Sequence, residues 1–283
     1  MPRRTVTFFL SFLLFLAPGS GSIAWAAGRL ALADRVFTWA CVFHTTSPKK
    51  LGSSMAGMLV LDPDGVNASD VPTIKSGNKL LLGYLSIGEV EEYRRWFKAP
   101  GIASLTIREN PHWKGNFLVD FRKPQWHALI ASVASEILDK GFDGLFLDTV
   151  NSFEQLPDPI AGKAAMVDLI ADLCTTIRTR RPDCYVILQN ADSLFDDPRV
   201  FEAVDGINQE SLFYSWLKGA VPDSERRHKL QRLVELRTRG KYVSLLEYTR
   251  KKSQISMTKR IALRYGLIPY FSTRELKTLY PIP

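Results

Sequence analysis

Residues 141–151 read GFDGLFLDTVN, a glycine-containing turn followed by an apolar run that ends on the carboxylate of Asp148. Side chains alternate along a strand, so Leu145 and Leu147 facing outward leave Phe146 and Asp148 facing the other way. In a closed barrel that other face is the interior, and the strand ends at the carboxyl-terminal mouth. The stretch therefore predicts a buried barrel strand that places Asp148 at the mouth.

Short apolar runs alternate with helical periodicity along the chain, a pattern typical of a parallel sheet with helices between its strands. Nine runs are candidate strands: 36–43, 56–62, 79–86, 116–121, 143–148, 184–190, 205–210, 242–248 and 266–272. In a chain of 283 residues this number favours an α/β fold, a (β/α)8 TIM barrel with one extra short segment. A doubly wound sheet is disfavoured because the sequence has neither GxGxxG nor GxxxxGK[ST].

Two of the intervening segments carry a clear apolar stripe of the kind that packs a helix against a sheet. One stripe precedes Gly141 and the other precedes Gly240, and each glycine suits the position just beyond a helix end. The stripes consist of Trp126, Leu129, Ile130, Val133 and Ile137, and of Leu230, Leu233, Val234 and Leu236.

Polar side chains stand where several of the apolar runs end. The parity that turns Asp148 inward also turns Glu210 inward at the end of 205–210, and barrel enzymes collect their chemistry at this face. Asp and Asn in such places also cap helices, and this alternative is open for Asp62 and Asn190. The candidate substrate-binding residues at or near the mouth are Asp62, Tyr84, Ser86, Glu89, Asp120, Asn151, Asn190 and Tyr248.

Two carboxylates at one mouth indicate glycoside hydrolysis, in which one acid protonates the leaving oxygen and the other attacks the anomeric carbon or activates water. We expect Asp148 to stay ionised beside the donors Tyr84, Ser86 and Asn151 and to act as the nucleophile of a retaining enzyme. Glu210 has the longer reach and is expected to be the general acid, keeping its proton because Asp148 is negative. Aromatic residues near the strand ends, among them Tyr248, would either stack on sugar rings or belong to the core.

The first 26 residues resemble a secretory signal peptide. Arg3 and Arg4 precede the apolar run FFLSFLLFLAP, which is short for a membrane span, and 24–26 read Ala-Trp-Ala, a pattern that suits signal-peptidase cleavage. We therefore expect residues 27–283 to form a single mature domain that is secreted or periplasmic. An uncleaved membrane anchor is the alternative, and no later segment could span a bilayer.

The formal charge of +8 would fall to 37 − 2 − 29 = +6 after loss of the signal. The basic residues are mostly scattered and accompany no recognition motif, so we expect a solvated basic face and no nucleic-acid partner. The four histidines never pair at metal-ligand spacing, and we expect no metal and no cofactor. Cys174 and Cys184 flank a short connection, which suits either a disulfide in an exported protein or two buried thiols.

Four blocks of the chain resemble glycoside hydrolase family 114, the endo-α-1,4-polygalactosaminidase-like TIM barrels. The blocks are GYLSIGEVEEYR (83–94), FLVDFRKPQW (117–126), GFDGLFLDTVNSFE (141–154) and VDGINQESLFY (204–214). The resemblance implies a barrel whose catalytic pair is Asp148 and Glu210 and whose substrate is an α-1,4-linked galactosamine-containing polysaccharide. The segment 189–197, QNADSLFDD, departs from the family by lacking a glycine in its turn, which bears on the substrate more than on the fold.

Two other classes of function use the same barrel. One is a sugar-binding protein that has lost turnover, and the other is an assembly component of an exopolysaccharide system. The presence of both candidate acids favours the enzyme over these alternatives, and hydrolysis of amino-sugar polymers would separate it from both.

Overall fold

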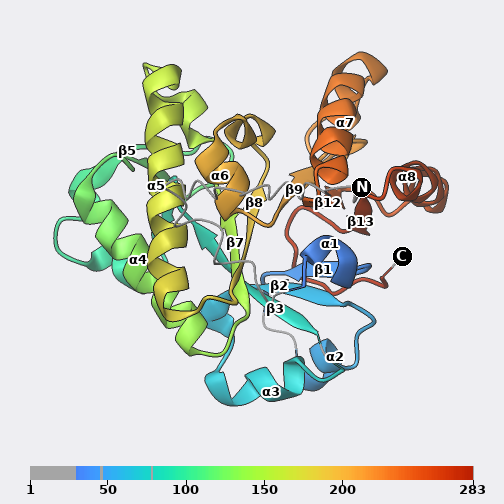
Figure 1. Ribbon diagram of the computed structural model, residues 1–283, viewed down its shortest axis with the longest axis horizontal. Coiled ribbons are helices and arrows are strands. Elements are labelled where there is room, and N and C mark those ends of the chain that lie inside the picture. Colours follow the sequence, from blue (N-terminus) through green and yellow to red (C-terminus); the bar gives the residue numbers. More distant parts are fainter. Residues whose placement is uncertain (1–29, 45–46, 78, 283) are drawn as a thin grey trace, which may run out of the picture.

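The computed structural model describes residues 30–44, 47–77 and 79–282, so the predicted signal peptide at 1–26 lies outside the described residues. Eight parallel strands form a nearly closed barrel with helices around it (Figure 1), which confirms the predicted TIM barrel. In their hydrogen-bonded order the strands are β1 (Trp39–Val42), β2 (Met58–Leu61), β3 (Leu80–Ser86), β7 (Gly144–Asp148), β8 (Tyr185–Gln189), β9 (Gly206–Glu210), β12 (Tyr242–Glu247) and β13 (Ile268–Phe271).

The first and last strands meet through side chains at the seam of the barrel. The indole of Trp39 in β1 donates to the carbonyl of Ile268 in β13 at 2.9 Å. Inside the barrel the same indole packs on Phe146 and Tyr270, with ring centroids 6.5 and 5.7 Å apart. Large rings from β1, β7 and β13 thus pack closely together inside the barrel.

The helices surround the strands and begin at prolines or capping acids in most cases. They are α1 (Leu32–Arg35), α2 (Pro48–Gly52), α3 (Val71–Ile74), α4 (Pro124–Asp139), α5 (Pro159–Arg180), α6 (Pro198–Ala203), α7 (Asp223–Thr238) and α8 (Lys252–Arg264). Short 3-10 helices are η2 (Pro63–Gly65), η3 (Ala68–Asp70), η4 (Arg95–Lys98), η5 (Ala103–Leu105), η6 (Ser152–Gln155) and η7 (Asp192–Asp196). Gly141 and Gly240 follow α4 and α7 with φ of +101° and +89°, the left-handed conformation predicted for them.

Packing of α4 on β3 confirms the predicted alternation of side chains. A Cβ on Gly83 would lie 2.3 Å from Cγ2 of Ile137, so Gly83 faces the helix and only a glycine fits there. The neighbouring Tyr84 consequently faces the barrel interior. This alternation of side chains along β3 places the Tyr84 side chain inside the barrel, beside the end of β7.

The run 116–121 is the extra segment and not a barrel strand. Its strand β6 (Asn116–Val119) pairs antiparallel with β4 (Glu89–Glu91) and β5 (Thr106–Glu109) in a separate small sheet that follows β3. The expectation that Asp120 shares the rim of the barrel strands was therefore wrong, because the strand before it belongs to this small sheet. A second hairpin, β10 (Tyr214–Ser215) with β11 (Gly219–Ala220), follows β9.

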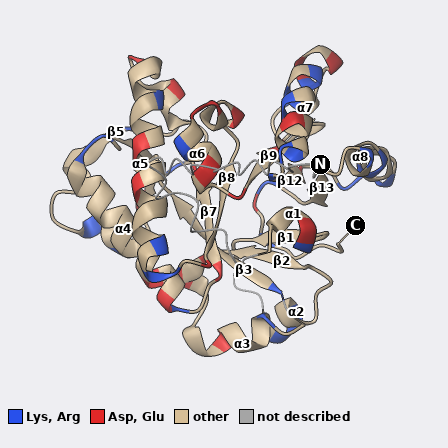
Figure 2. Ribbon diagram, in the orientation of Figure 1, with Lys and Arg blue, Asp and Glu red and all other residues tan. Residues whose placement is uncertain are grey.

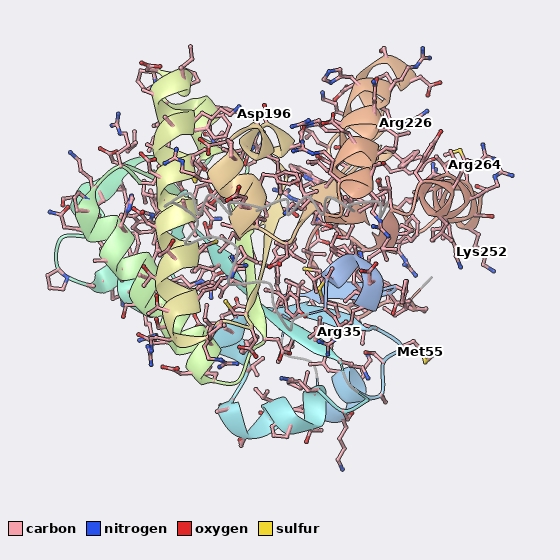
Figure 3. The ribbon with its side chains drawn as sticks, viewed as in Figure 1. Arg35, Met55, Asp196, Arg226, Lys252 and Arg264 are labelled. Carbon is pink, nitrogen blue, oxygen red and sulfur yellow. The ribbon has the colours of Figure 1, made fainter. Side chains whose placement is uncertain are left out.

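Charged residues lie mainly on the outer helices, whereas the barrel strands are largely uncharged (Figure 2). Figure 3 shows Lys252 and Arg264 of α8 at the periphery of the molecule, consistent with a solvated basic face. Cys41, Cys174 and Cys184 are all buried. No helix within the described residues has the length and apolar character needed to cross a membrane.

Candidate active site

Asp148 ends β7 and is held by donors from two strands. Its Oδ2 accepts a hydrogen bond from the hydroxyl of Tyr84 at 3.0 Å, and its Oδ1 accepts from the backbone N–H of Thr149 at 2.7 Å. Thr149 has φ of +58°, a conformation that is costly for a β-branched residue. Its hydroxyl compensates by contacting Ser86 Oγ at 2.8 Å and accepting from the Gly88 N–H at 2.9 Å. The strained turn thus fixes the direction of the Asp148 carboxylate.

Glu210 ends β9 and is held in a similar way. The hydroxyl of Tyr248 donates to Oε2 at 2.7 Å, and the amide of Asn190 donates to Oε1 at 3.1 Å. The oxygen of the Asn190 side chain accepts from the backbone N–H of Glu210 at 3.1 Å and from Gln209 at 3.0 Å. Asn190 therefore orients Glu210 through both the nitrogen and the oxygen of its side-chain amide. The N-cap of the 3-10 helix η7 is Ala191, so Asn190 does not take the capping role that was its alternative.

The two carboxylates lie close enough for their charges to interact. Burial, followed by repulsion from Glu210, raises the pKa of Asp148 to about 7, against the opposing hydrogen bonds from Thr149 and Tyr84. Burial therefore opposes the donors that were expected to keep Asp148 ionised. Asp148 and Glu210 also raise the pKa of the buried thiol of Cys41, after burial itself, so both acids face the interior above β1.

A family model for the glycoside hydrolases GH114 matches residues 24–283. The chain belongs to family GH114. Like other members it is a glycoside hydrolase, and the sequence resemblance to this family is confirmed.

Solved structures and a curated relative are similar to this chain. The glycoside hydrolase domain of PelA from Pseudomonas aeruginosa superposes with a TM-score of 0.72 at 22% identity, over 86% of this chain and 96% of that one. Aspergillus fumigatus Ega3 in complex with galactosamine gives a TM-score of 0.71 at 15% identity, over 91% and 97%. An uncharacterized protein of Thermotoga maritima is 25% identical over 97% of this chain and 91% of its own length. The two structural likenesses support the shared barrel.

Glu89 is a buried carboxylate near Asp148 and Glu210. Both its oxygens accept from the amide of Asn110, at 2.9 and 3.1 Å, and burial raises its pKa. The charge of Glu89, like that of Glu210, raises the pKa of Asp148. Asn110 lies after β5 in the small sheet, and sequence reasoning missed it because nothing in the linear pattern brings residue 110 back to β4.

The remaining predicted residues lie in different surroundings. Asp62 caps η2 by accepting from the N–H of Asp64 and pairs with the buried Arg94 at 2.7 Å, which matches the capping alternative. Asp120 pairs with Arg122 at 2.6 Å, and Arg122 lowers its pKa. Asn151 is the N-cap residue of η6, three residues after the end of β7. The structure thus brings together one set, which comprises Tyr84, Asp148, Asn190, Glu210 and Tyr248, with Ser86 and Glu89 beside it.

Proposed function

We propose that the protein is an exported hydrolase of an α-1,4-linked galactosamine-containing polymer that acts with retention of configuration. The observation that carries the proposal is the pair Asp148 and Glu210, which end two barrel strands, are each held by a tyrosine and repel one another. Membership of GH114 and the likeness to Ega3, whose structure holds galactosamine, support the substrate.

The reaction assigns a different task to each carboxylate. Glu210 donates its proton to the glycosidic oxygen while Asp148 attacks the anomeric carbon, so the leaving sugar departs as an alcohol and a glycosyl ester remains. Glu210, now ionised, takes a proton from water, which displaces Asp148 and restores the free enzyme. Tyr84 stays in contact with the nucleophile, and Tyr248 and Asn190 hold the acid toward the bond to be cleaved.

An amino sugar suits the electrostatics of this site. The charged groups that raise the pKa of Asp148 are the carboxylates of Glu210 and Glu89. A substrate ammonium group near them would lower the pKa of Asp148, so that binding itself ionises the nucleophile. A neutral acetylated sugar gives no such help, so the free amine is the preferred form.

Export is the part of the proposal that rests on the first 26 residues alone. The arginine pair, the apolar run and the Ala-Trp-Ala pattern support a mature chain that begins near Ala27. N-terminal sequencing of the protein from its native compartment tests this, and a chain that still begins at Met1 and sediments with membranes would indicate an anchor.

The enzymatic proposal is tested with α-1,4-linked galactosamine oligomers in free-amine and acetylated forms. We expect hydrolysis of the free amine, and a loss of at least ~10²-fold in Asp148→Asn and in Glu210→Gln. Asp197→Asn is the matched control, because the carboxylate of Asp197 caps α6 and pairs with Arg199. Binding of the oligomers without any release of shorter products would instead identify a sugar-binding barrel.

A further inference from the structure

Three loops from distant parts of the chain meet in a stack of rings around a guanidinium group. Arg274, which follows β13, lies 4.1 Å from the ring centroid of Trp113 and 3.9 Å from that of Trp216. The two indoles have centroids 6.2 Å apart, and Arg274 also donates to the carbonyl of His112. We refer to Trp113, Trp216 and Arg274 as the cross-mouth bridge.

The order of the strands places this bridge across the opening of the barrel. Trp113 lies in the turn between β5 and β6 of the small sheet that continues from β3, and Trp216 follows β10 in the hairpin after β9. Between β3 and β9 stand β7 and β8 on one side of the barrel, and β2, β1, β13 and β12 on the other. A link between the loops of β3 and β9 therefore spans the mouth.

The small sheet also reaches the loop that follows Asp148. Arg108 in β5 donates to the side chain of Gln155 in η6 at 2.8 Å, and η6 comes directly after β7. Asn110, at the end of β5, holds Glu89, whose charge acts on Asp148. The sheet is thus tied to the nucleophile side of the site and, through the bridge, to the hairpin that follows Glu210.

The two cation–π contacts of the cross-mouth bridge are strong enough to keep it closed and weak enough to let it open. Each cation–π pair contributes about 0.5–1 kcal/mol at an exposed site, so the two pairs of Arg274 contribute roughly 1–2 kcal/mol. Trp113 remains 42% exposed even with Arg274 on its ring. An exposed indole beside a sugar-cleaving site offers an apolar face on which a pyranose ring can stack.

We propose that the cross-mouth bridge retains the polymer, so that one bound chain is cleaved several times before it dissociates; this inference rests on the proposed function. A chain that lies between the bridge and the two carboxylates leaves either by sliding along its own axis or by opening the bridge. Opening that costs roughly 1–2 kcal/mol slows sideways escape by about 5- to 30-fold. The enzyme therefore makes a first internal cut and then releases short products from the same chain.

Arg274→Ala tests this directly, because it removes the cation that both indoles share. The readout is the fall in weight-average chain length of a galactosamine polymer, measured by light scattering, per new reducing end, which does not depend on how much of a variant is active. Without the bridge, cuts spread over many chains, so we expect the weight-average length to fall about threefold further at equal reducing ends. Arg239→Ala is the matched control, since Arg239 lies 3.9 Å from the ring of Phe201 on the outer helices.

The results distinguish the retention role of the cross-mouth bridge from the proposed hydrolase activity. A chain-length curve for Arg274→Ala that superposes on that of the wild type, with hydrolysis intact, would overturn the retention role and leave the proposed function standing. Trp216→Ala checks the same conclusion from the other loop and is expected to shift the curve in the same direction. A wild-type protein that releases no reducing ends would overturn the proposed function itself.

Discussion

Replacing Asp148 by asparagine should make the protein more stable at alkaline pH than the wild type. In the folded state the pKa of Asp148 is raised from 3.8 to about 7, mainly by burial and then by Glu210. The folded protein therefore binds a proton that the unfolded chain releases, and the wild type loses stability as the pH rises through this interval. Asparagine has no proton to lose, so the variant escapes this part of the pH dependence.

The size of the effect follows from the shift. A change from 3.8 to about 7 corresponds to about 4 kcal/mol at most, at ~1.4 kcal/mol for each pKa unit. Asp148 is half-buried and shares its repulsion with Glu210, so we expect about 2 kcal/mol. This amount is the predicted gain of Asp148→Asn over the wild type between about pH 4 and about pH 8.

Urea unfolding of both proteins at the two pH values measures this difference. Asp197→Asn serves as a control of opposite sign: Arg199 lowers the pKa of Asp197, so this substitution should cost more stability at high pH than at low pH. If the free energies of unfolding of Asp148→Asn and the wild type run parallel across the range, Asp148 is ionised throughout and the argument from burial is incorrect.

Three further predictions concern catalysis and stability. On activated aryl substrates, whose leaving group needs no proton, kcat/KM should rise with pH through about 7 as Asp148 ionises, and Glu210→Gln should move this limb to lower pH because it removes a charge that raises this pKa; a limb that does not move contradicts the coupling. Tyr248→Phe removes a hydrogen bond to a carboxylate and should lower kcat by about 10- to 100-fold with a smaller change in KM, and equal losses in both would argue against a role in the chemical step. Glu247 is fully buried and accepts the N–H groups of Phe213 and Tyr214, so Glu247→Ala should cost about 2–4 kcal/mol in urea unfolding, and a cost below ~0.5 kcal/mol would contradict this contact.

Strand periodicity predicted the barrel and the inward direction of both acids because alternation is a local property. Gly83 against Ile137 and Tyr84 beside Asp148 show the same parity at work in β3. Partner choice between strands is not local, and this is why the sequence did not reveal that the run 116–121 is the extra segment, which pairs with β4 and β5.

The supporting contacts of the site depend on distant parts of the chain. Asn110 reaches Glu89 only because β5 folds back over β4 and β6, and Arg274 meets Trp113 across 161 positions of sequence. The raised pKa of Asp148 also could not be predicted from the sequence, because burial is set by the whole barrel, whereas donors such as Tyr84 can be predicted from neighbouring strands. The alternation of side chains along β12 turns Glu247 away from the barrel interior, so the sequence did not indicate a role for it at the site. Its carboxylate nevertheless holds the loop that follows Glu210.

The most direct test of the catalytic pair is the configuration of the glycosyl azide that each variant forms from an activated α-linked substrate, read by proton NMR. Asp148→Asn should yield the β-azide, because azide takes the place of the missing nucleophile on the opposite face of the sugar. Glu210→Gln should yield the α-azide, because azide displaces Asp148 from the covalent intermediate. If azide restores neither variant and both keep more than about a hundredth of the wild-type rate, a smaller loss than a missing acid–base group causes, Asp148 and Glu210 are not the catalytic pair.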